Sequence, residues 1–301
     1  MYYHQPVMPD LVLKYLNVAA DKVYVDCTLG EGGHSEFILK NYRIKLLIGI
    51  EQDSELIAIA KERLKIYENV IFINGNFKDL DRLLEKIGIE RVDGILFDLG
   101  ISMYHIKKSE KGFSFQQELP LDMRLSSKGE SAKDIVNYYS EQALSKIIWT
   151  YGEERFAQRI ARFIVNHREK EPIRTTRQLA EIIKKAVPSR YWQKRLHPAT
   201  RTFQALRIVV NNELSNLEIG VKKAIEMLSL YGRICVISYH SLEDRIVKQQ
   251  FKFYEYRKDG TEGSIKILTK KPVKPSDEEI KKNRSARSAK LRAAEKIKRE
   301  G

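Results

Sequence analysis

The sequence predicts an α/β fold in which a doubly wound, mostly parallel sheet is interrupted by an inserted segment made only of helices. Along the first hundred residues, short apolar runs alternate with segments of helical periodicity. The runs are nearly continuous, which is typical of parallel strands covered on both faces. From about residue 109 no convincing strand follows until the apolar run of residues 232–238.

Before the insertion, strands and helices alternate regularly. The expected strands are residues 23–27, 46–50, 70–73 and 92–98, and the expected helices are residues 9–16, 35–41, 54–67 and 80–87. Such alternation predicts βαβ units in one parallel sheet.

The inserted segment shows helical spacing throughout. Helices are expected at residues 131–139, 142–150, 153–167 and 176–185, with Thr175 capping the last. We therefore expect a core domain of residues 1–108 and 209–301 and an inserted helical domain of residues 109–208.

The core is expected to resume after the insertion. The expected elements are a long helix over residues 200–230, a strand at 232–238, a helix at 242–253 and a hairpin-like pair of strands at 265–268 and 291–297. Residues 270–287 are charge-rich and contain two prolines, so partial mobility is expected there.

A glycine-rich turn, Gly30-Glu31-Gly32-Gly33, follows the first strand, and the second strand ends at Glu51. This is the layout of a nucleoside-cofactor site, because glycines admit the ligand to the backbone and the acid accepts bonds from ribose hydroxyls. A dinucleotide fingerprint needs a third glycine where Ser35 stands. The pattern therefore favours S-adenosyl-L-methionine over NAD, with a plain tight turn as the alternative.

Further polar and aromatic residues end the neighbouring strands. Because ligands bind at the carboxyl ends of parallel strands, we expect Phe77 to cover the adenine and Asp98 to lie near the reacting group. Each has a structural alternative: Asp26 and Asp98 as strand-end caps, and Phe77 as plain core.

The two cysteines argue against covalent catalysis at a ring carbon. Cys27 lies in the first turn and Cys235 in the middle of a strand, so neither occupies the place of a nucleophile. Transfer to an amine needs only an acceptor for the amine hydrogens, and Asp98 has that chemistry. The Pro-Pro-aromatic string of many amino-methylases does not follow Asp98.

Charge indicates a polyanionic partner. The 301-residue chain has a net charge of +14, and residues 266–301 hold thirteen basic and five acidic residues. Nucleic acid is the default partner for such a field, although a heat-adapted surface is an alternative. Two cysteines, no signal pattern, no membrane-spanning run and no Cys/His metal spacing lead us to expect a cytoplasmic protein without a metal.

Several segments have the residues of an RNA reader. Arg201, Gln204 and Arg207 share one face of the expected helix. Other candidates are Phe113, Phe115, Arg124 and His240. The alternative is that these polar groups join the inserted domain to the core through buried salt bridges.

Six strings in order resemble the RsmH (MraW) family of ribosomal RNA methyltransferases. They are residues 26–35, 112–115, 120–124, 151–154, 197–207 and 238–245. The resemblance implies a Rossmann-like class I methyltransferase core with a seven-stranded sheet. It also implies methylation by S-adenosyl-L-methionine of the N4 amine of a cytidine in the decoding region of 16S rRNA.

The same resemblance implies the site residues. Cofactor contacts fall on Gly32, Gly33, His34, Glu51, Phe77 and Asp98. The family usually has a glutamine where this chain has His105, which can still donate to the carboxylate or the adenine of the cofactor. The late string of residues 283–288 also departs from the family pattern.

The candidate residues predict how a cytosine would be bound and methylated. A flipped cytosine stacks on Phe113, Phe115 or Tyr104, and Asp98 accepts a bond from N4. Arg201 and Arg207 hold phosphate, and His240 contacts the base. The partner is 16S rRNA in the small ribosomal subunit or an assembly intermediate, and the oligomeric state, a homodimer included, stays open.

Three other functions fit less well. The same fold could methylate DNA or a protein amine, or the chain could be a non-catalytic assembly factor that binds RNA. An NAD-linked oxidoreductase is the weakest rival because the third glycine is missing.

Overall fold

The computed structural model describes residues 5–126, 128–192, 197–255 and 263–297. The chain forms two compact units, one of Met1–Gly100 with Leu214–Gly301 and one of Ile101–Glu213. The divisions thus fall after residues 100 and 213, where the sequence predicts 108 and 208.

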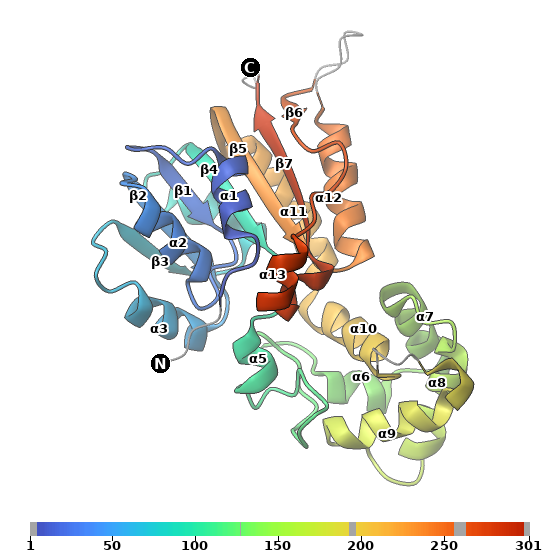
Figure 1. Cartoon of the computed structure of the whole chain (residues 1–301). Helices are drawn as coiled ribbons and strands as arrows, with labels where there is room; N and C mark the ends of the chain where they lie inside the picture. The colour runs from blue at the N-terminus through green and yellow to red at the C-terminus, as the bar shows by residue number, and fades with distance from the viewer. Residues whose placement is uncertain (1–4, 127, 193–196, 256–262, 298–301) are drawn as a thin grey trace. The chain divides into compact units, whose positions relative to one another are not determined.

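The first unit is built on a seven-stranded sheet in the order β3-β2-β1-β4-β5-β7-β6 (Figure 1). The strands are β1 (Val23–Asp26), β2 (Leu46–Glu51), β3 (Val70–Asn74), β4 (Val92–Asp98), β5 (Leu228–Ser238), β6 (Ile265–Ile267) and β7 (Lys290–Lys296). Strands β1 to β5 pair in parallel, whereas β7 pairs antiparallel with both β5 and β6. The predicted fold class is confirmed, and so are all seven strands.

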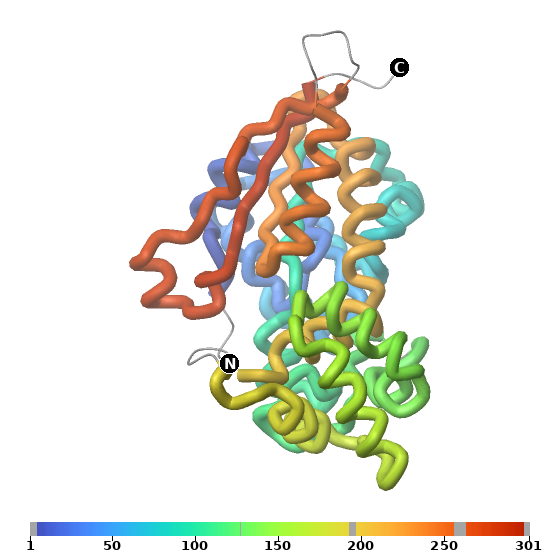
Figure 2. Tube along the Cα trace, turned by 90° about the vertical axis from the view of Figure 1, so that its right-hand side faces the viewer, coloured from blue at the N-terminus to red at the C-terminus, as the bar shows by residue number. Residues whose placement is uncertain are grey.

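Helices cover both faces of this sheet, which explains its continuously apolar strands. One face packs on α1 (Pro9–Leu16), α2 (Gly33–Asn41) and α3 (Ser54–Arg63), and the other on α4 (Leu80–Glu85), α11 (Glu213–Met227) and α12 (Ser241–Phe253). Neighbouring strand residues point to opposite faces. Leu47 therefore joins one cluster and Ile48 the other, both with 0% exposure. Figure 2 shows α11 and α12 side by side, and the Gln250 amide donates to Glu218 between them.

The second unit is helical. It contains α5 (Met103–Lys107), α6 (Ala132–Tyr138), α7 (Glu141–Gly152), α8 (Ala157–Arg168), α9 (Thr176–Ala186) and α10 (Thr200–Asn211). Thr175 and Gln178 form a capping box at the start of α9, as predicted. A Cβ at Gly152 would lie 2.7 Å from the Arg201 carbonyl, so only glycine lets α7 approach α10 this closely.

The single long helix predicted over residues 200–230 is wrong. Asn212 takes a left-handed conformation (φ 51°) and ends α10, and α11 begins at the next residue. Asparagine tolerates this conformation better than most residues, so it commonly ends helices. The chain passes here from the helical unit back to the sheet unit.

One helix is shorter than predicted, and another was not predicted. Helix α3 ends at Arg63 rather than Tyr67. Within the charge-rich stretch expected to be mobile in part, Asp277–Lys282 form α13, whose N-cap Ser276 accepts from the Glu279 N–H. Ser276 followed by Glu279 is a helix-start signal that the composition of the segment hides.

Candidate functional site

The glycine turn after β1 rests against the tip of β2. Gly30 and Gly32 have positive φ angles of 52° and 79°, which glycine adopts at no steric cost. The Leu29 N–H donates to the Ile50 carbonyl at 3.0 Å. A Cβ on Gly49 would lie 2.7 Å from Leu29 Cδ1, so the glycine in β2 leaves the space in which Leu29 anchors the turn.

The Glu51 carboxylate joins this turn to the next one. Its Oε2 accepts from the Gly30 N–H at 3.0 Å, and its Oε1 accepts from Gln52 and Asp53 N–H groups at 2.8 and 2.9 Å. Glu51 therefore lies beside the glycines, as the sequence predicts, and it also shapes the loop.

Asp98 ends β4 at the same edge of the sheet. Its N–H donates to Thr28 Oγ1 at 2.6 Å, which ties it to the loop after β1. Oδ1 accepts from the Tyr239 hydroxyl at 2.7 Å, and Oδ2 lies 3.4 Å from His34 Nδ1. About a quarter of the side chain (24%) stays exposed, so the carboxylate is held by neighbours and still reachable.

His34 is buried behind this carboxylate. Its Nε2 lies 2.8 Å from the carbonyl of Val7, and the residue is 6% exposed. Nearby Asp26 is 2% exposed and accepts from Ser35 Oγ at 2.8 Å and from the Thr28 N–H at 3.2 Å. His34, which the resemblance assigns to the cofactor, thus has both ring nitrogens facing groups of the protein itself.

Asp26 and Asp98 share an electrostatic environment. Desolvation raises the pKa of Asp98 above its usual range, while His34 and the Tyr239 hydroxyl oppose that rise. Desolvation likewise raises the pKa of Asp26, against His34 and Ser35. Desolvation and the charge of Asp98 keep the pKa of Tyr239 well above its usual range, so the hydroxyl is a neutral donor.

Phe77 packs into the core of the first unit. Its ring meets Phe97 edge-on at 5.4 Å, and a Cβ on Gly220 of α11 would lie 2.6 Å from its Cδ2. Asn76 caps the short turn that Phe77 begins by accepting from the Lys78 N–H. These contacts favour the core alternative for Phe77, although part of the ring remains accessible.

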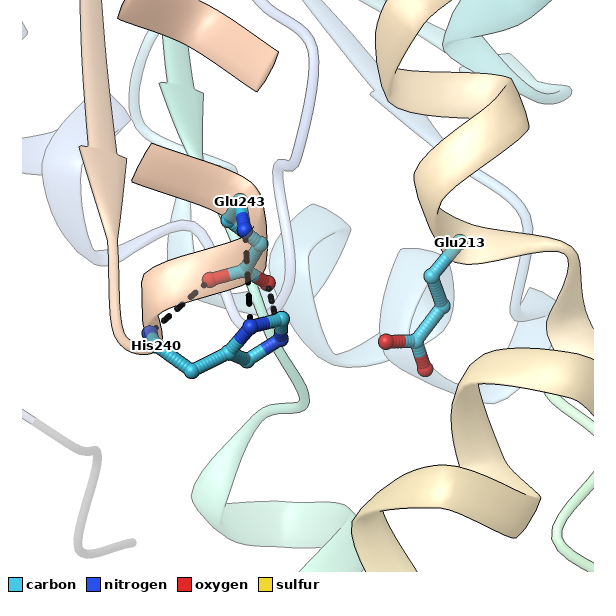
Figure 3. Close-up of side chains that lie close together, drawn as sticks. All are labelled: Glu213, His240 and Glu243. Atoms are coloured by element: carbon cyan, nitrogen blue, oxygen red, sulfur yellow. Dashed lines mark hydrogen bonds and ion pairs between the residues drawn. The ribbon is translucent and has the colours of Figure 1, made fainter. Parts of the chain in front are cut away.

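His240 begins helix α12. It forms a capping box with Glu243: His240 Nδ1 accepts from the Glu243 N–H, and Glu243 Oε2 accepts from the His240 N–H at 3.3 Å. Figure 3 shows the two side chains together and also draws Glu213, where α11 begins. The expected base contact by His240 would have to coexist with this capping role.

The predicted aromatic candidates lie in the second unit. Phe113 is 9% exposed and packs in the helical core with His105, at 5.1 Å between ring centroids. The core of the helical unit thus covers most of Phe113, and stacking of a base on this residue stays a prediction. Phe115 lies partly accessible between His197 and Phe203. His105 itself is buried on α5.

The polar candidates of α10 are bonded within the same unit. Arg201 donates to the Glu153 carbonyl at 3.2 Å, and Gln204 donates to the Tyr151 carbonyl at 3.2 Å. Arg207 pairs with Glu213 at 2.8 Å.

Arg124, in the loop before α6, donates to both oxygens of Asp122. The contacts of Arg124, Arg201, Gln204 and Arg207 named here all have partners within the helical unit, so they do not supply the salt bridges to the core that the structural alternative expects.

With this geometry in place, the chain can be compared with known proteins. A model of the MraW methylase family matches residues 1–297. The chain belongs to the MraW methylase family. This confirms the resemblance drawn from the motifs.

Relatives of the chain agree with the family. The ribosomal RNA small subunit methyltransferase H of Clostridium botulinum (strain Kyoto / Type A2) is 48% identical and covers 98% of this chain and 99% of its own. The protein of the same name from Sulfurihydrogenibium sp. (strain YO3AOP1) is 49% identical and covers 99% and 100%. A solved rRNA methylase from Streptococcus thermophilus aligns over 96% of this chain and 94% of its own, with 11% identity and a TM-score of 0.45.

The two cysteines of this MraW methylase are both buried and free. Desolvation raises the pKa of each thiol above its usual range, and the thiolate is the nucleophilic form. These properties do not favour either residue as a covalent catalyst. Among helices of the described residues, none has the length and apolarity to cross a membrane.

One residue at this edge of the sheet, Tyr239, was not predicted from the sequence. It lies in the string 238–245, in which His240 is the predicted site residue. A tyrosine next to the end of a strand that pairs with β4 was the available signal.

Proposed function

We propose that this chain transfers a methyl group from S-adenosyl-L-methionine to the exocyclic N4 amine of a cytidine in the decoding region of 16S ribosomal RNA. The observation that carries the proposal is the meeting of the glycine turn, Glu51 and Asp98 at one edge of the sheet. Family membership and the names of the relatives support both the reaction and the RNA.

The groups at this edge fit an adenosyl sulfonium. Ribose hydroxyls donate hydrogen bonds, and the Glu51 carboxylate has lone pairs to accept them beside a turn whose glycines expose backbone. The Ser35 hydroxyl, near the start of α2, donates its hydrogen bond to Asp26. A ligand without phosphate suits that arrangement better than a pyrophosphate does. When bound, the cofactor supplies an electrophilic methyl group.

The chain's own residues would then act on the acceptor. The N4 lone pair of cytosine is delocalised into the ring, so it needs a hydrogen-bond acceptor that draws on the amine hydrogens. Asp98 offers such an acceptor, with a carboxylate that is held on both oxygens and partly exposed. Positive charge that develops on the amine is stabilised by the same carboxylate.

The helical unit and the net charge support an RNA partner. Phe115 stays partly accessible, and Arg201 is 38% exposed, so both remain candidates for base and phosphate contacts. In this proposal the inserted unit recognises the substrate, and Asp98 meets a base that has left its stack.

Mass spectrometry of 16S rRNA nucleosides, from cells with and without this gene, tests the proposal. We expect N4-methylated cytidine to disappear on deletion and to return with the wild-type gene. In parallel, labelled methyl uptake is compared among small ribosomal subunits, duplex DNA and bulk protein. Uptake by DNA or protein alone would replace the RNA assignment, and the absence of any methylated product would leave an assembly factor.

A further inference from the structure

The side chains of Tyr239 and His34 both contact the carboxylate of Asp98, and neither contact was predicted from the sequence. Tyr239 holds Oδ1 at 2.7 Å and His34 faces Oδ2 at 3.4 Å. They come from different parts of the first unit, Tyr239 from the end of β5 and His34 from the start of α2. Their convergence on one carboxylate needs an explanation beyond local packing.

The contacts of His34 orient its ring. The Val7 carbonyl, 2.8 Å from Nε2, can only accept, so Nε2 carries a hydrogen. The other ring nitrogen, Nδ1, then faces Asp98 Oδ2 at 3.4 Å.

The neighbours of the Asp98 carboxylate favour its ionised form. The charge of His34 opposes the rise in the pKa of both Asp26 on β1 and Asp98 on β4. The Tyr239 hydroxyl donates to Asp98, which also suits the ionised form. The other groups facing this cluster are Glu243 of α12, Cys235 of β5 and, toward Tyr239, Glu279 of α13.

Tyr239 is itself firmly placed. Its N–H donates to Glu243 Oε2 at 2.8 Å, at the capping box of α12. Its ring lies over the turn after β4, where Gly100 has a φ of 94° and an added Cβ would come within 3.5 Å of Tyr239 Cδ2. The hydroxyl therefore reaches Asp98 from a fixed frame.

We propose that Tyr239 and His34 are positioning residues that hold the Asp98 carboxylate ionised and aimed at the acceptor amine. This inference rests on the proposed function. In the reaction the N4–carbon bond forms and the carbon–sulfur bond breaks, with its electron pair left on sulfur as a neutral thioether. The amine is cationic at that moment, and its proton passes to Asp98 and from there to solvent through the exposed part of the side chain.

The variant Tyr239→Phe tests the role of the hydroxyl with little change in packing. We expect the affinity for S-adenosyl-L-methionine to stay within about twofold and kcat on small ribosomal subunits to fall on the order of tenfold. The acid limb of the pH profile of kcat/KM should move to higher pH, because a carboxylate that loses a donor ionises less readily.

Tyr24→Phe is the matched control. The Tyr24 hydroxyl accepts from the Ala19 N–H at 2.9 Å, in the same unit but away from Asp98. This variant should keep both kcat and the pH profile. If the acid limb of the pH profile of kcat/KM is unshifted in Tyr239→Phe, the proposal is overturned, whether or not kcat falls. A purely structural role of Tyr239 would leave that limb where it is in the wild type.

A second measurement does not need activity. Nitrogen NMR of the His34 ring compares the wild type with Asp98→Asn. The signal of Nδ1, which faces Asp98 Oδ2, should change, and the signal of Nε2, which faces the Val7 carbonyl, should not. An Nδ1 signal that is the same in both proteins would overturn the role of His34. If the wild type methylates no ribosomal RNA but the Nδ1 signal responds to Asp98→Asn, then the proposed function fails and the arrangement of the pair stands.

Discussion

Two acids at the strand tips of the sheet unit and two acids of the helical unit have pKa shifts in opposite directions. At the strand tips of the sheet unit, desolvation raises the pKa of Asp26 and Asp98. In the helical unit, burial would also raise the pKa of Asp122, but bonds from Arg124 outweigh it, and bonds from Ser131 lower the pKa of Asp134. Acids that stabilise a fold are usually paired, whereas acids kept at an energetic cost tend to mark reactive sites. The contrast supports the proposal that the chemistry takes place in the sheet unit.

Asp98→Asn should have the largest effect. The amide keeps the size of the side chain but accepts a proton poorly, so kcat should fall by about 10²- to 10⁴-fold. Labelled methyl transfer to small ribosomal subunits measures this loss, and calorimetry should show that S-adenosyl-L-methionine still binds. Turnover close to that of the wild type would remove Asp98 from the catalytic role.

Ile148→Ala should have the next largest effect, because it should weaken the helical unit and leave the sheet unit intact. Ile148 is 0% exposed in the helical core, and the cavity should cost about 2–4 kcal/mol. Hydrogen exchange should quicken in α7 and α8, and methyl transfer to RNA should drop, while binding of the methyl donor persists.

The exposed Ile66 (73%) provides the control for that substitution. Ile66→Ala should change stability by less than about 0.5 kcal/mol. If Ile148→Ala also abolishes binding of the methyl donor, then the two units are not separable in the way proposed.

Asp134→Asn should weaken the helical unit slightly. Asp134 accepts from the Ser131 N–H and hydroxyl at 2.8 and 2.6 Å, completing the capping box of α6, so the loss should be about 0.5–1 kcal/mol. The stability from a lowered pKa is present above the usual value of 3.8 and is lost as pH falls through the folded value. Exchange of α6 amides should therefore differ between variant and wild type at neutral pH and converge in acid.

Asp26→Asn should show the pH dependence opposite to that of Asp134→Asn. The difference in stability between the variant and the wild type should be smallest near pH 4. A raised pKa makes ionisation unfavourable for the folded state, so the wild type loses stability as pH rises above the usual value of 3.8. The free energy of unfolding of the variant, relative to the wild type, should increase between about pH 4 and 7. Urea titrations across that range measure it, and a difference that falls with pH would reverse our reading of Asp26.

The strands were predictable because burial on both faces leaves a local signature. Leu46 to Ile50 are apolar at every position except Gly49, and β2 covers them. The break at Asn212 was harder, because the apolar spacing continues from α10 into α11. Only the left-handed conformation of one residue separates the two helices.

The sequence predicts where the site residues lie on the sheet, but not which side chains contact them. Parallel register brings Glu51 and Asp98 to one edge, and that follows from where the strands end. The contact of His34 with Val7 joins residues 27 positions apart, and that of Tyr239 with Asp98 joins residues 141 apart. No local pattern encodes such pairs. The burial of Phe113 likewise depends on how the helices of its unit meet.

The placement of β7 has a consequence for synthesis of the chain. This strand, Lys290–Lys296, lies between β5 and β6, although it is the last of the seven to be made. A growing chain can complete the contiguous helical unit early, whereas the sheet keeps an open edge at β5 until Lys290–Lys296 have left the ribosome. Termination before Lys290 would therefore leave that edge free to aggregate.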